Sequence, residues 1–305
     1  MKNLILLSVI VGLSHCIYDE ELAVDMVYAS ALSYCPSHKV MSRGCKAATV
    51  ATENIDLIPF FSKSNNNSLT PIYMTLMKRE SQKQIIVGFS GTKGGDELLD
   101  EVTHIFPKEY DIHKDRGMKV FGFFYDHYKE DFRNDFLKQI SDTMNKDEYE
   151  NYDVIFTGHS LGGALAMHAA ADAILSGLLK NNYVYVYTFG QPRVGNAEFI
   201  DEFLSNVNGF YRVIHNNDIV PHLPPCIPDF NEGCIRHGFL IPVFPYHAAT
   251  EVLYEQGFGS YKVCSTFEGE DKTCSLSKSG NSIPDHLTYF GVKVGKFHTY
   301  EPQEI

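Results

Sequence analysis

The fold of this 305-residue chain is decided by the stretch Asp153-Val154-Ile155-Phe156-Thr157-Gly158-His159-Ser160-Leu161-Gly162-Gly163-Ala164. Its first five residues are mostly apolar and β-branched, which is typical of a buried parallel strand. The alanine-rich residues 164–175 predict a helix directly after it. A strand that enters a helix through Gly-x-Ser-x-Gly is a nucleophile elbow, a turn too tight for a Cβ at Gly158 or Gly162, with Ser160 strained and its hydroxyl presented outward. The competing interpretation is an ordinary glycine-rich turn with a solvated serine, which the rest of the chain has to exclude.

Length and composition indicate a globular protein with a sizeable core. The chain is 44% hydrophobic, and 305 residues suffice for one large domain or two small ones. Its formal net charge of −12 argues against nucleic acid and anionic membrane surfaces as partners. A neutral lipid surface, which is approached through apolar contact, stays open as a partner.

Residues 1–16 are predicted to be a secretory signal peptide. Lys2 supplies the positive start, and the apolar run from Leu4 to Leu13 is too short to span a bilayer. Cleavage is predicted after Cys16, and no later stretch has membrane-spanning length. We therefore expect a mature chain of residues 17–305 that is secreted to the extracellular space.

Six cysteines remain after this cleavage, an even number that suits disulfides in an oxidising compartment. The sequence alone permits fifteen connectivities, and we predict the three local pairs. No C-x-x-C spacing is present, so a zinc ribbon is not indicated. Asn66 begins an N-glycosylation sequon in a polar loop, which is consistent with secretion. The predicted pairs are Cys35–Cys45, Cys226–Cys234 and Cys264–Cys274.

The rest of the chain predicts strands and helices in alternation, with no internal repeat and no linker. We expect helices over residues 18–34 and 121–144, loop-rich structure over 36–68, and strands over 72–79, 84–89, 183–189 and 210–214. Alternating elements of this kind favour an α/β fold, with one domain over residues 17–305 and a mostly parallel sheet covered by helices on both faces.

Two backbone amides are candidates for stabilising an oxyanion beside Ser160. Leu161 would donate from the N-terminus of the elbow helix, where the helix dipole adds partial positive charge. Thr92 ends the stretch Gly88-Phe89-Ser90-Gly91-Thr92, whose glycines let a strand end aim an amide at the site. On this stretch alone, an ordinary glycine turn is the favoured interpretation.

Residues 94–106 have the pattern of a lid. Gly94 and Gly95 form a natural hinge, and an amphipathic pattern follows as far as Phe106. Such a helix can cover a site when closed and meet lipid when open. The alternative is a surface helix that is simply packed on the core.

A serine nucleophile needs a histidine to take its proton and a carboxylate to orient that histidine. When the nucleophile lies on such an elbow, the acid and then the histidine follow it in the chain. Asp218 fits the role of the acid because it lies in the loop after the strand over 210–214. The alternative is an acid that merely caps this turn. Asp201 falls inside a predicted helix, and Asp229 lies between two cysteines.

Five histidines follow Asp218, and the pattern does not choose among them. His222 is too close to Asp218 in sequence to reach across easily. His247 precedes an apolar run, and His286 lies in a polar loop that opens a short helix. From the residues alone, His247 and His286 remain competitors for the base. The five are His222, His237, His247, His286 and His298.

Five segments together resemble the class 3 lipases, the fungal-lipase-like branch of the α/β-hydrolases. Residues 158–166 are similar to that family's nucleophile motif, and 188–196 to the strand and turn after it. Residues 212–221 resemble the loop bearing its acid, 285–291 the loop bearing its histidine, and 89–92 its oxyanion strand. The match extends from residue 89 to residue 291 with the order and spacing of the family.

The resemblance implies an α/β-hydrolase fold with Ser160, Asp218 and His286 as the catalytic triad. It also implies an oxyanion hole of Thr92 and Leu161, a lid over residues 94–106, a structural role for the His247 segment, and chemistry without metal or organic cofactor. Two positions depart from the family pattern. Ser90 stands where many members carry Arg, and the lid has no Trp, which weakens the expectation of a strong response to a lipid–water interface.

The sequence thus predicts a secreted carboxylic-ester hydrolase, with triacylglycerol as the expected substrate, encountered at a lipid–water interface. A phospholipase A-type enzyme and an esterase for soluble esters would use the same residues. A catalytically silent lipid carrier is the alternative from another class, although its usual mark is a broken triad. The sequence leaves the oligomeric state open.

Overall fold

The computed structural model describes residues 17–36, 45, 55–64, 71–92, 106–113, 117–229, 233–237, 244–265, 267 and 269–295. Three predictions therefore lie outside the described residues: the signal peptide over 1–16, the glycosylation site at Asn66, and all of the lid over 94–106 except Phe106. Among the helices that are described, none combines the length and apolar character needed to cross a bilayer.

Eight strands of the described chain form one sheet, in the order β1-β2-β3-β6-β7-β8-β11-β12. The five inner strands β3, β6, β7, β8 and β11 are parallel to one another. The pairs β1–β2, β2–β3 and β11–β12 are antiparallel. The strands are β1 (Asp56–Lys63), β2 (Tyr73–Arg79), β3 (Gln84–Phe89), β6 (Asp153–His159), β7 (Val184–Phe189), β8 (Gly209–His215), β11 (Glu251–Tyr254) and β12 (Lys262–Val263). The predicted mostly parallel sheet is confirmed.

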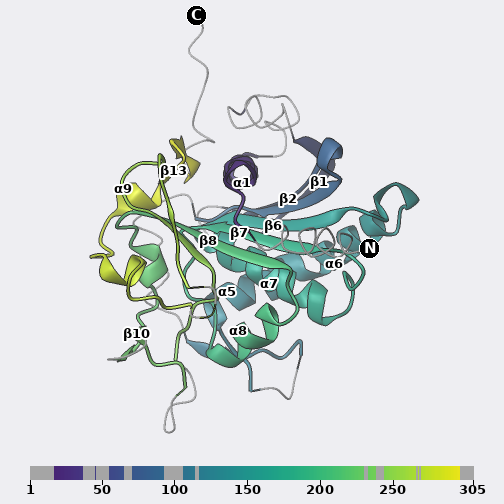
Figure 1. The fold of residues 1–305 in the computed structure, drawn as a ribbon. Coiled ribbons are helices and arrows are strands. Elements are labelled where there is room, and N and C mark those ends of the chain that lie inside the picture. The colour runs from purple at the N-terminus through teal and green to yellow at the C-terminus, as the bar shows by residue number, and fades with distance from the viewer. Residues whose placement is uncertain are drawn as a thin grey trace, which may run out of the picture.

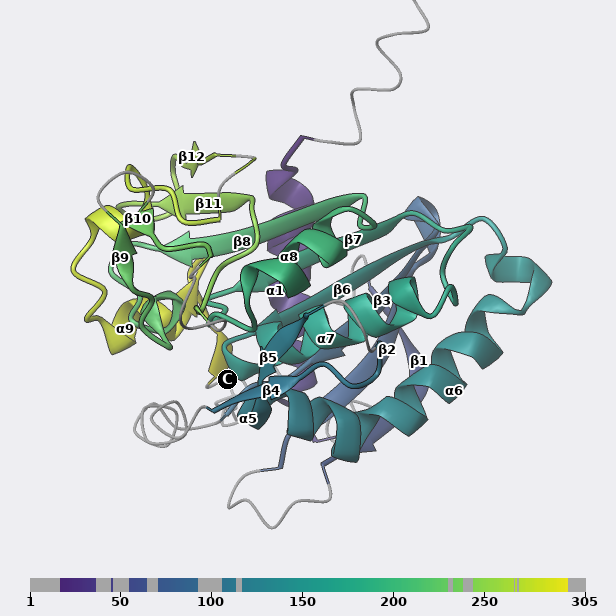
Figure 2. The same ribbon diagram turned by 90° about the horizontal axis from the view of Figure 1, so that it is seen from below.

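Helices cover both faces of this sheet. Figure 1 shows α1 on one face and α5, α6, α7 and α8 on the other, and Figure 2 views the sheet from the side of these four helices. Each face closes over a large apolar core of its own. The helices are α1 (Glu20–Ser33), α5 (Gly122–Asp126), α6 (Arg133–Met144), α7 (Leu161–Leu175), α8 (Ala197–Leu204) and α9 (Ile283–His286).

The sequence explains why two of these helices lie where they do. Residues 161–173 of α7 are all buried, as expected of a helix that is apolar all round. At the start of α1, the Asp19 side chain accepts a hydrogen bond from the Leu22 amide and caps the first turn. The predicted helix over residues 18–34 and the predicted strand pair over 72–89 are both confirmed.

Three short two-stranded sheets lie outside the main sheet in the described residues. They are β4 (Pro107–Glu109) with β5 (Lys119–Phe121), β9 (Pro228–Asp229) with β10 (Gly233–Cys234), and β13 (Thr288–Tyr289) with β14 (Val292–Lys293). The last of these directly follows α9 in the chain, at the same end of the molecule (Figure 1).

Strand β1 contradicts the predicted loop over residues 36–68. Pro59 in the middle of its sequence argues against a central strand, because proline has no backbone N–H to donate to a neighbouring strand. The structure resolves this conflict by placing β1 at the edge of the sheet, with a register shift between Leu57 and Phe61 in its pairing with β2. An edge strand with a bulge is where a proline is tolerated.

The predicted helix over residues 121–144 is present but irregular. After α5, the chain adopts a π-helical stretch over His127–Phe132 before it continues as α6. The wider turn brings His127, Tyr128 and Phe132 inward together, where all three are buried. A π-helical insertion of this kind does not show in the apolar spacing of the sequence.

The predicted alternation of strands and helices does not hold throughout the described chain. Between the parallel strands β8 and β11, the described residues contain no α-helix, only the 3₁₀ turn η5 (Val220–His222) and the β9–β10 pair. Parallel neighbours normally need a helix between them to cover the sheet. The described residues between β8 and β11 are mostly loops. A disulfide and buried ion pairs hold these loops in position.

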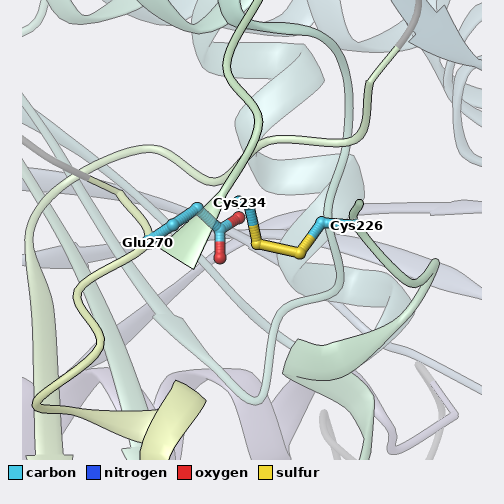
Figure 3. A group of neighbouring side chains, drawn as sticks. All are labelled: Cys226, Cys234 and Glu270. Atoms are coloured by element: carbon cyan, nitrogen blue, oxygen red, sulfur yellow. A yellow bond between two sulfur atoms is a disulfide. The ribbon is translucent and has the colours of Figure 1, made fainter. Parts of the chain in front are cut away.

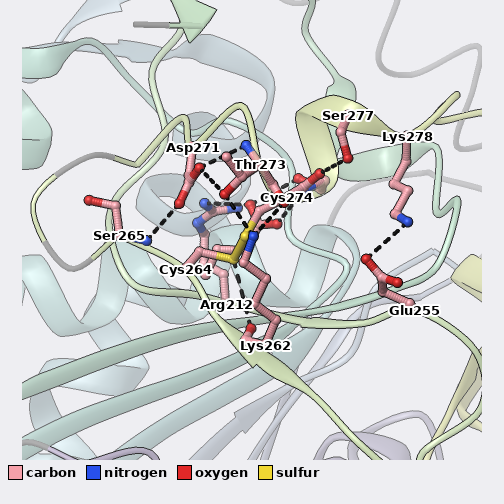
Figure 4. Close-up of a disulfide and its surroundings, with 12 residues drawn as sticks. Arg212, Glu255, Lys262, Cys264, Ser265, Asp271, Thr273, Cys274, Ser277 and Lys278 are labelled. Atoms are coloured by element: carbon pink, nitrogen blue, oxygen red, sulfur yellow. Dashed lines mark hydrogen bonds and ion pairs between the residues drawn. A yellow bond between two sulfur atoms is a disulfide. The ribbon is translucent and has the colours of Figure 1, made fainter.

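The disulfides join the cysteines as three local pairs. They are Cys35–Cys45, Cys226–Cys234 and Cys264–Cys274, with Cα–Cα distances of 6.4, 5.7 and 6.3 Å. Figure 4 shows the third pair beside Arg212 of β8, in a loop where Asp271 accepts hydrogen bonds from the Ser265 and Thr273 amides. This disulfide therefore closes a loop that packs directly on the sheet.

Two buried ion pairs fasten the same region. Arg193, after β7, makes a bidentate contact with Glu270 at 2.8 and 2.9 Å, and Glu270 also accepts the His247 amide at 2.8 Å. Arg212 lies 3.3 Å from Glu251 and donates to the carbonyl oxygens of Ala248 and Gly269. The Arg193 pair, through Glu270, thus ties His247 to the sheet, and Arg212 ties Ala248 to it directly.

We expect Glu270→Ala to destabilise the protein strongly, because it leaves the Arg193 guanidinium buried without its partner. The free energy of unfolding should fall by about 3–5 kcal/mol. The measurement is denaturant unfolding with the disulfides intact. Asp142→Ala is the matched control, since its pair with Lys138 is exposed, and its loss should cost about 1 kcal/mol or less. Equal effects of the two variants would contradict this expectation.

Candidate active site

The elbow holds Ser160 in a conformation that non-glycine residues rarely adopt. Its backbone has φ 61° and ψ −131°, between the end of β6 and the start of α7. The neighbouring glycines are required sterically: a Cβ at Gly158 would lie 2.1 Å from the Gly162 carbonyl oxygen, and one at Gly162 would lie 2.3 Å from that of Phe89. The Ser160 hydroxyl is buried and has no hydrogen-bond partner among the described residues, so it is left available for a reacting group.

His286 and Asp218 form a buried pair. Nδ1 of His286 lies 2.9 and 3.0 Å from the two carboxylate oxygens of Asp218, although the residues are 68 positions apart. Because a carboxylate accepts only, Nδ1 carries the proton of the neutral imidazole. Nε2 is then left with a lone pair, which is the state that a general base requires.

Asp218 receives further hydrogen bonds that keep it ionised. The Tyr289 hydroxyl donates to Oδ2 at 2.5 Å, and the Val220 amide donates to Oδ1 at 2.9 Å. Burial by itself would raise the pKa of Asp218, but the His286 imidazole and these donors outweigh it and hold the pKa below its ordinary value. Asp218 is therefore a carboxylate at neutral pH, despite complete burial.

Polar contacts lock the loops of the acid and the histidine together. Asp285, the residue before His286, accepts from the Asn216 side chain at 2.9 Å and from the Asn217 amide at 3.1 Å. Ser282, which caps α9, donates its amide to the Asn217 carbonyl at 2.8 Å. The loop after β8 and the segment that opens α9 thus form one unit.

The carboxyl ends of neighbouring parallel strands bring these loops to the elbow. At the end of β7, a Cβ on Gly190 would lie 2.5 Å from Asp218 Oδ2 and 2.8 Å from His286 Nδ1. The ring of His159, the residue before Ser160, stacks on that of His286 with centroids 4.5 Å apart. Open α/β sheets bind their ligands at this edge, and the three predicted triad residues lie there together.

The predicted oxyanion donors also lie at this edge. Gly91 follows β3, and a Cβ there would come within 3.1 Å of Ser160 Cβ, so the strand end runs directly past the elbow. Thr92 is the next residue and is partly buried, and Leu161 is the fully buried first residue of α7. Ser90, the departure from the family pattern, is occupied with a mutual backbone and side-chain pairing to Tyr73.

The competing histidine, His247, is held elsewhere. Its Nε2 donates to the Pro221 carbonyl oxygen at 2.7 Å. Burial and the nearby Arg212 and Arg193 guanidinium groups lower its pKa well below the usual range. His247 is therefore neutral and donates its Nε2 proton to a backbone carbonyl, which indicates a structural role.

The remaining candidates take other positions. His222 lies half-buried in η5, His237 is an exposed neighbour of Glu198, and His298 lies outside the described residues. Asp201 is in α8 and pairs with Arg236. Asp229 belongs to the short strand β9.

Sequence analysis did not single out Tyr289, Gly190 or His159 for the site. Tyr289 and Gly190 owe their importance to Asp218, which only folding brings near them. His159 occupies the variable position of the Gly-x-Ser-x-Gly motif, where any residue satisfies the pattern. No local signal distinguishes these three from ordinary core residues.

One cluster in the described residues has the composition of a metal site but not its chemistry. Cys226, Cys234 and Glu270 place their ligand atoms within 4.8 Å of one another (Figure 3). Both sulfurs are consumed in a disulfide, and the carboxylate is paired with Arg193. The second such group, Glu251 with Cys264 and Cys274, is likewise built on a disulfide.

Comparisons with known proteins point to one family. The class 3 lipase family matches residues 86–227. Lipase ZK262.3 of Caenorhabditis elegans is 32% identical over 265 residues, spanning 80% of this chain and 72% of that protein. A Rhizomucor miehei lipase is 33% identical over 252 residues, spanning 80% of this chain and 61% of its own length. A solved structure of Rhizomucor miehei triacylglyceride lipase superposes with a TM-score of 0.70 at 26% identity, covering 92% of this chain and 98% of the other.

Fold and comparisons together define a carboxylic-ester hydrolase with the α/β-hydrolase fold. Within that superfamily, the chain belongs to the class 3 lipase family, and it resembles a solved triacylglyceride lipase.

We expect Tyr289→Phe to destabilise the protein in a pH-dependent way. At pH 7 it removes a hydrogen bond to a buried carboxylate, which should cost about 1.5–3 kcal/mol. Because the folded-state pKa of Asp218 is lowered, the stability that it contributes is present above its ordinary pKa and is lost as pH falls through the folded value. The difference from wild type should therefore shrink only in acid, as measured by unfolding at pH 7 and near pH 3.

Tyr152→Phe is the matched control for this prediction. Its hydroxyl donates at 2.8 Å to Glu80, an exposed carboxylate. Removal of the Tyr152 hydroxyl should leave the free energy of unfolding nearly unchanged at either pH. If Tyr289→Phe cost as little as this control at pH 7, the buried hydrogen bond would not be stabilising Asp218.

Proposed function

We propose that this protein is a secreted triacylglycerol lipase that works through Ser160, His286 and Asp218 and an acyl-enzyme intermediate. The observation that carries the proposal is the buried His286–Asp218 pair at the same sheet edge as the strained Ser160. A serine presented on such an elbow, beside a histidine with its Nδ1 held by a carboxylate, is the arrangement that acyl transfer requires.

Each residue has a defined part in the reaction. Ser160 Oγ attacks the ester carbonyl carbon while His286 Nε2 takes the hydroxyl proton. Asp218 stabilises the imidazolium that forms. When the tetrahedral intermediate collapses, the imidazolium gives its proton to the leaving alcohol. Water then attacks the acyl-enzyme by the same path and releases the fatty acid.

The amides of Thr92 and Leu161 would stabilise the oxyanion. Charge develops on the former carbonyl oxygen only in the tetrahedral state, so donors aimed there lower the barrier without tightening the binding of the substrate. Losing one such donor typically costs about 3–4 kcal/mol. The first turn of α7 adds its partial positive charge at the same place.

Secretion is supported by two independent features. Residues 1–16 have the pattern of a cleavable signal peptide. Three disulfides join the described residues, and disulfides persist mainly in oxidising compartments. Analysis of the N-terminus of the protein recovered from medium tests the cleavage after Cys16.

Triacylglycerol is favoured over other esters by the relatives, which carry the names lipase and triacylglyceride lipase. The experiment that tests this choice is hydrolysis of emulsified triacylglycerol, phospholipid vesicles and a monomeric short-chain ester, each measured across the solubility limit of the lipid. A preference for phospholipid or for the dissolved ester would replace the lipase proposal with a phospholipase or an esterase. Failure on all three would favour a lipid carrier.

Ser160→Ala should abolish hydrolysis of a short-chain ester in a folded protein, because it removes the nucleophile. His286→Ala should cause a comparable loss, typically of several orders of magnitude, because the members of a triad act as a unit. His247→Ala is the control, and its effect should fall on stability. Activity assays and thermal unfolding separate the two effects, and the reverse pattern for the two histidines would overturn the assignment of the base.

A further inference from the structure

Both ring nitrogens of His159 have hydrogen-bond partners, although the Gly-x-Ser-x-Gly pattern permits any residue at this position. Its ring is buried between α1 and the loop of the base. Nδ1 lies 2.8 Å from the Tyr34 hydroxyl, and Nε2 lies 2.7 Å from the backbone carbonyl oxygen of His286. The residue next to the nucleophile is therefore bonded to the main chain of the base, 127 positions further along the chain.

The chemistry of these partners determines where the protons lie. A carbonyl oxygen only accepts, so His159 Nε2 carries the imidazole proton and donates it. Nδ1 then has a lone pair and accepts from the Tyr34 hydroxyl. Burial and, to a smaller extent, the proximity of His286 together lower the pKa of His159 to about 3. The ring is thus neutral and in one tautomer at neutral pH.

Tyr34 brings this pair against the oxyanion strand. It is the completely buried residue at the C-terminal end of α1. Burial raises the pKa of its hydroxyl, and the nearby Gly91 backbone amide partly offsets this rise. A Cβ on Gly91 would lie 2.6 Å from this hydroxyl, so the strand end lies directly against it.

We propose that His159 is a positioning residue for hydrolysis, which sets the base and the oxyanion strand relative to Ser160. The chain of hydrogen bonds runs from Tyr34 through His159 to the main chain of His286. Because Gly91 packs against the Tyr34 hydroxyl, the chain brings together the three segments that carry Thr92, Ser160 and His286. The inference rests on the proposed function, since it assigns His159 a part in that same reaction.

Geometry explains why such a link would matter. The His159 and His286 rings stack with centroids 4.5 Å apart and an interplanar angle of 30°. His159 therefore contacts both the ring and the carbonyl of the base. A displacement of about 1 Å in a reacting group can cost roughly 100-fold in rate. A link at the carbonyl of the base suppresses movement of its main chain toward or away from Ser160.

His168 provides a matched comparison. It is also fully buried and its pKa is also lowered to about 3, by burial. Neither of its ring nitrogens has a hydrogen-bond partner among the described residues. From α7, the His168 ring packs against the aromatic rings of Tyr128 and Phe199. It thus reports the cost of removing a buried neutral histidine that holds nothing in the active site.

The test compares four variants with wild type: His159→Leu, His159→Gln, Tyr34→Phe and His168→Leu. Hydrolysis of p-nitrophenyl butyrate gives kcat and KM, and thermal unfolding gives the temperature range in which every variant is folded. A second readout is the far-downfield proton NMR signal of the His286 Nδ1–H that is bonded to Asp218. This signal reports the geometry of the pair without requiring turnover.

We expect kcat of His159→Leu to fall by about 10- to 100-fold with KM nearly unchanged, and the downfield signal to shift or broaden. His159→Gln should recover most of this loss, because its side-chain amide can donate to the His286 carbonyl. Tyr34→Phe should lower kcat by a smaller factor, since it frees only one end of the chain. His168→Leu should lower stability and leave kcat and the signal as in wild type.

A wild-type kcat in folded His159→Leu would overturn the inference, as would equal losses in His159→Gln and His159→Leu. If His159→Leu does not fold, Tyr34→Phe decides alone: unchanged kcat and an unshifted signal would reject the chain of hydrogen bonds. Failure of the proposed function is a separate outcome, seen as absence of hydrolysis in the wild type itself.

Discussion

The close approach of backbone atoms between β6 and α7 is the constraint on which the rest of this structure depends. The chain must reverse within a few residues, and only hydrogen atoms fit at Gly158 and Gly162. The positive φ at Ser160 is the consequence. Such strain persists only when the surroundings over-determine it, and here they do. The strand before it is central in the sheet, and the helix after it is buried on all sides. The two apolar cores therefore hold the nucleophile in place.

The chemistry at this elbow is polar and is supplied by loops that the cores do not reach. Asp218 is buried, yet His286, the Tyr289 hydroxyl and the Val220 amide all donate hydrogen bonds to it, so its charge is compensated. The site thus combines a low-dielectric environment with fixed donors, which is the condition under which electrostatic stabilisation is strongest. The same principle operates further out. Around the crossover from β8 to β11, whose described residues contain no α-helix, the buried pairs of Arg193 and Arg212 hold the loop that carries Gly269 and Glu270 against the sheet.

His159 illustrates how the separate parts are coupled. The residue belongs to the most local of the motifs, yet both of its ring partners come from distant segments, Tyr34 from α1 and His286 from α9. Helix α1 thus has a second role besides covering one face of the sheet. Through Tyr34, its C-terminal end contacts the active-site edge, so the first described helix and the last one meet at the nucleophile.

The sequence by itself determined what depends on near neighbours. The elbow, the parallel strands on either side of it and the helix over residues 161–175 follow from glycine spacing and apolar runs, because sterics and burial act within a few residues. Strand β1 was not predicted. A proline such as Pro59 argues against a strand unless that strand is known to lie at the edge of the sheet. Only the tertiary structure decided which side chains meet. His247 and His286 are equivalent as patterns, and the resemblance of residues 285–291 to the lipase family was needed to prefer one. In the structure, Asp218 contacts His286 and Pro221 contacts His247. The physical reason is that buried ion pairs between residues far apart in the sequence help to set the path of the chain after β8, and no local periodicity records them.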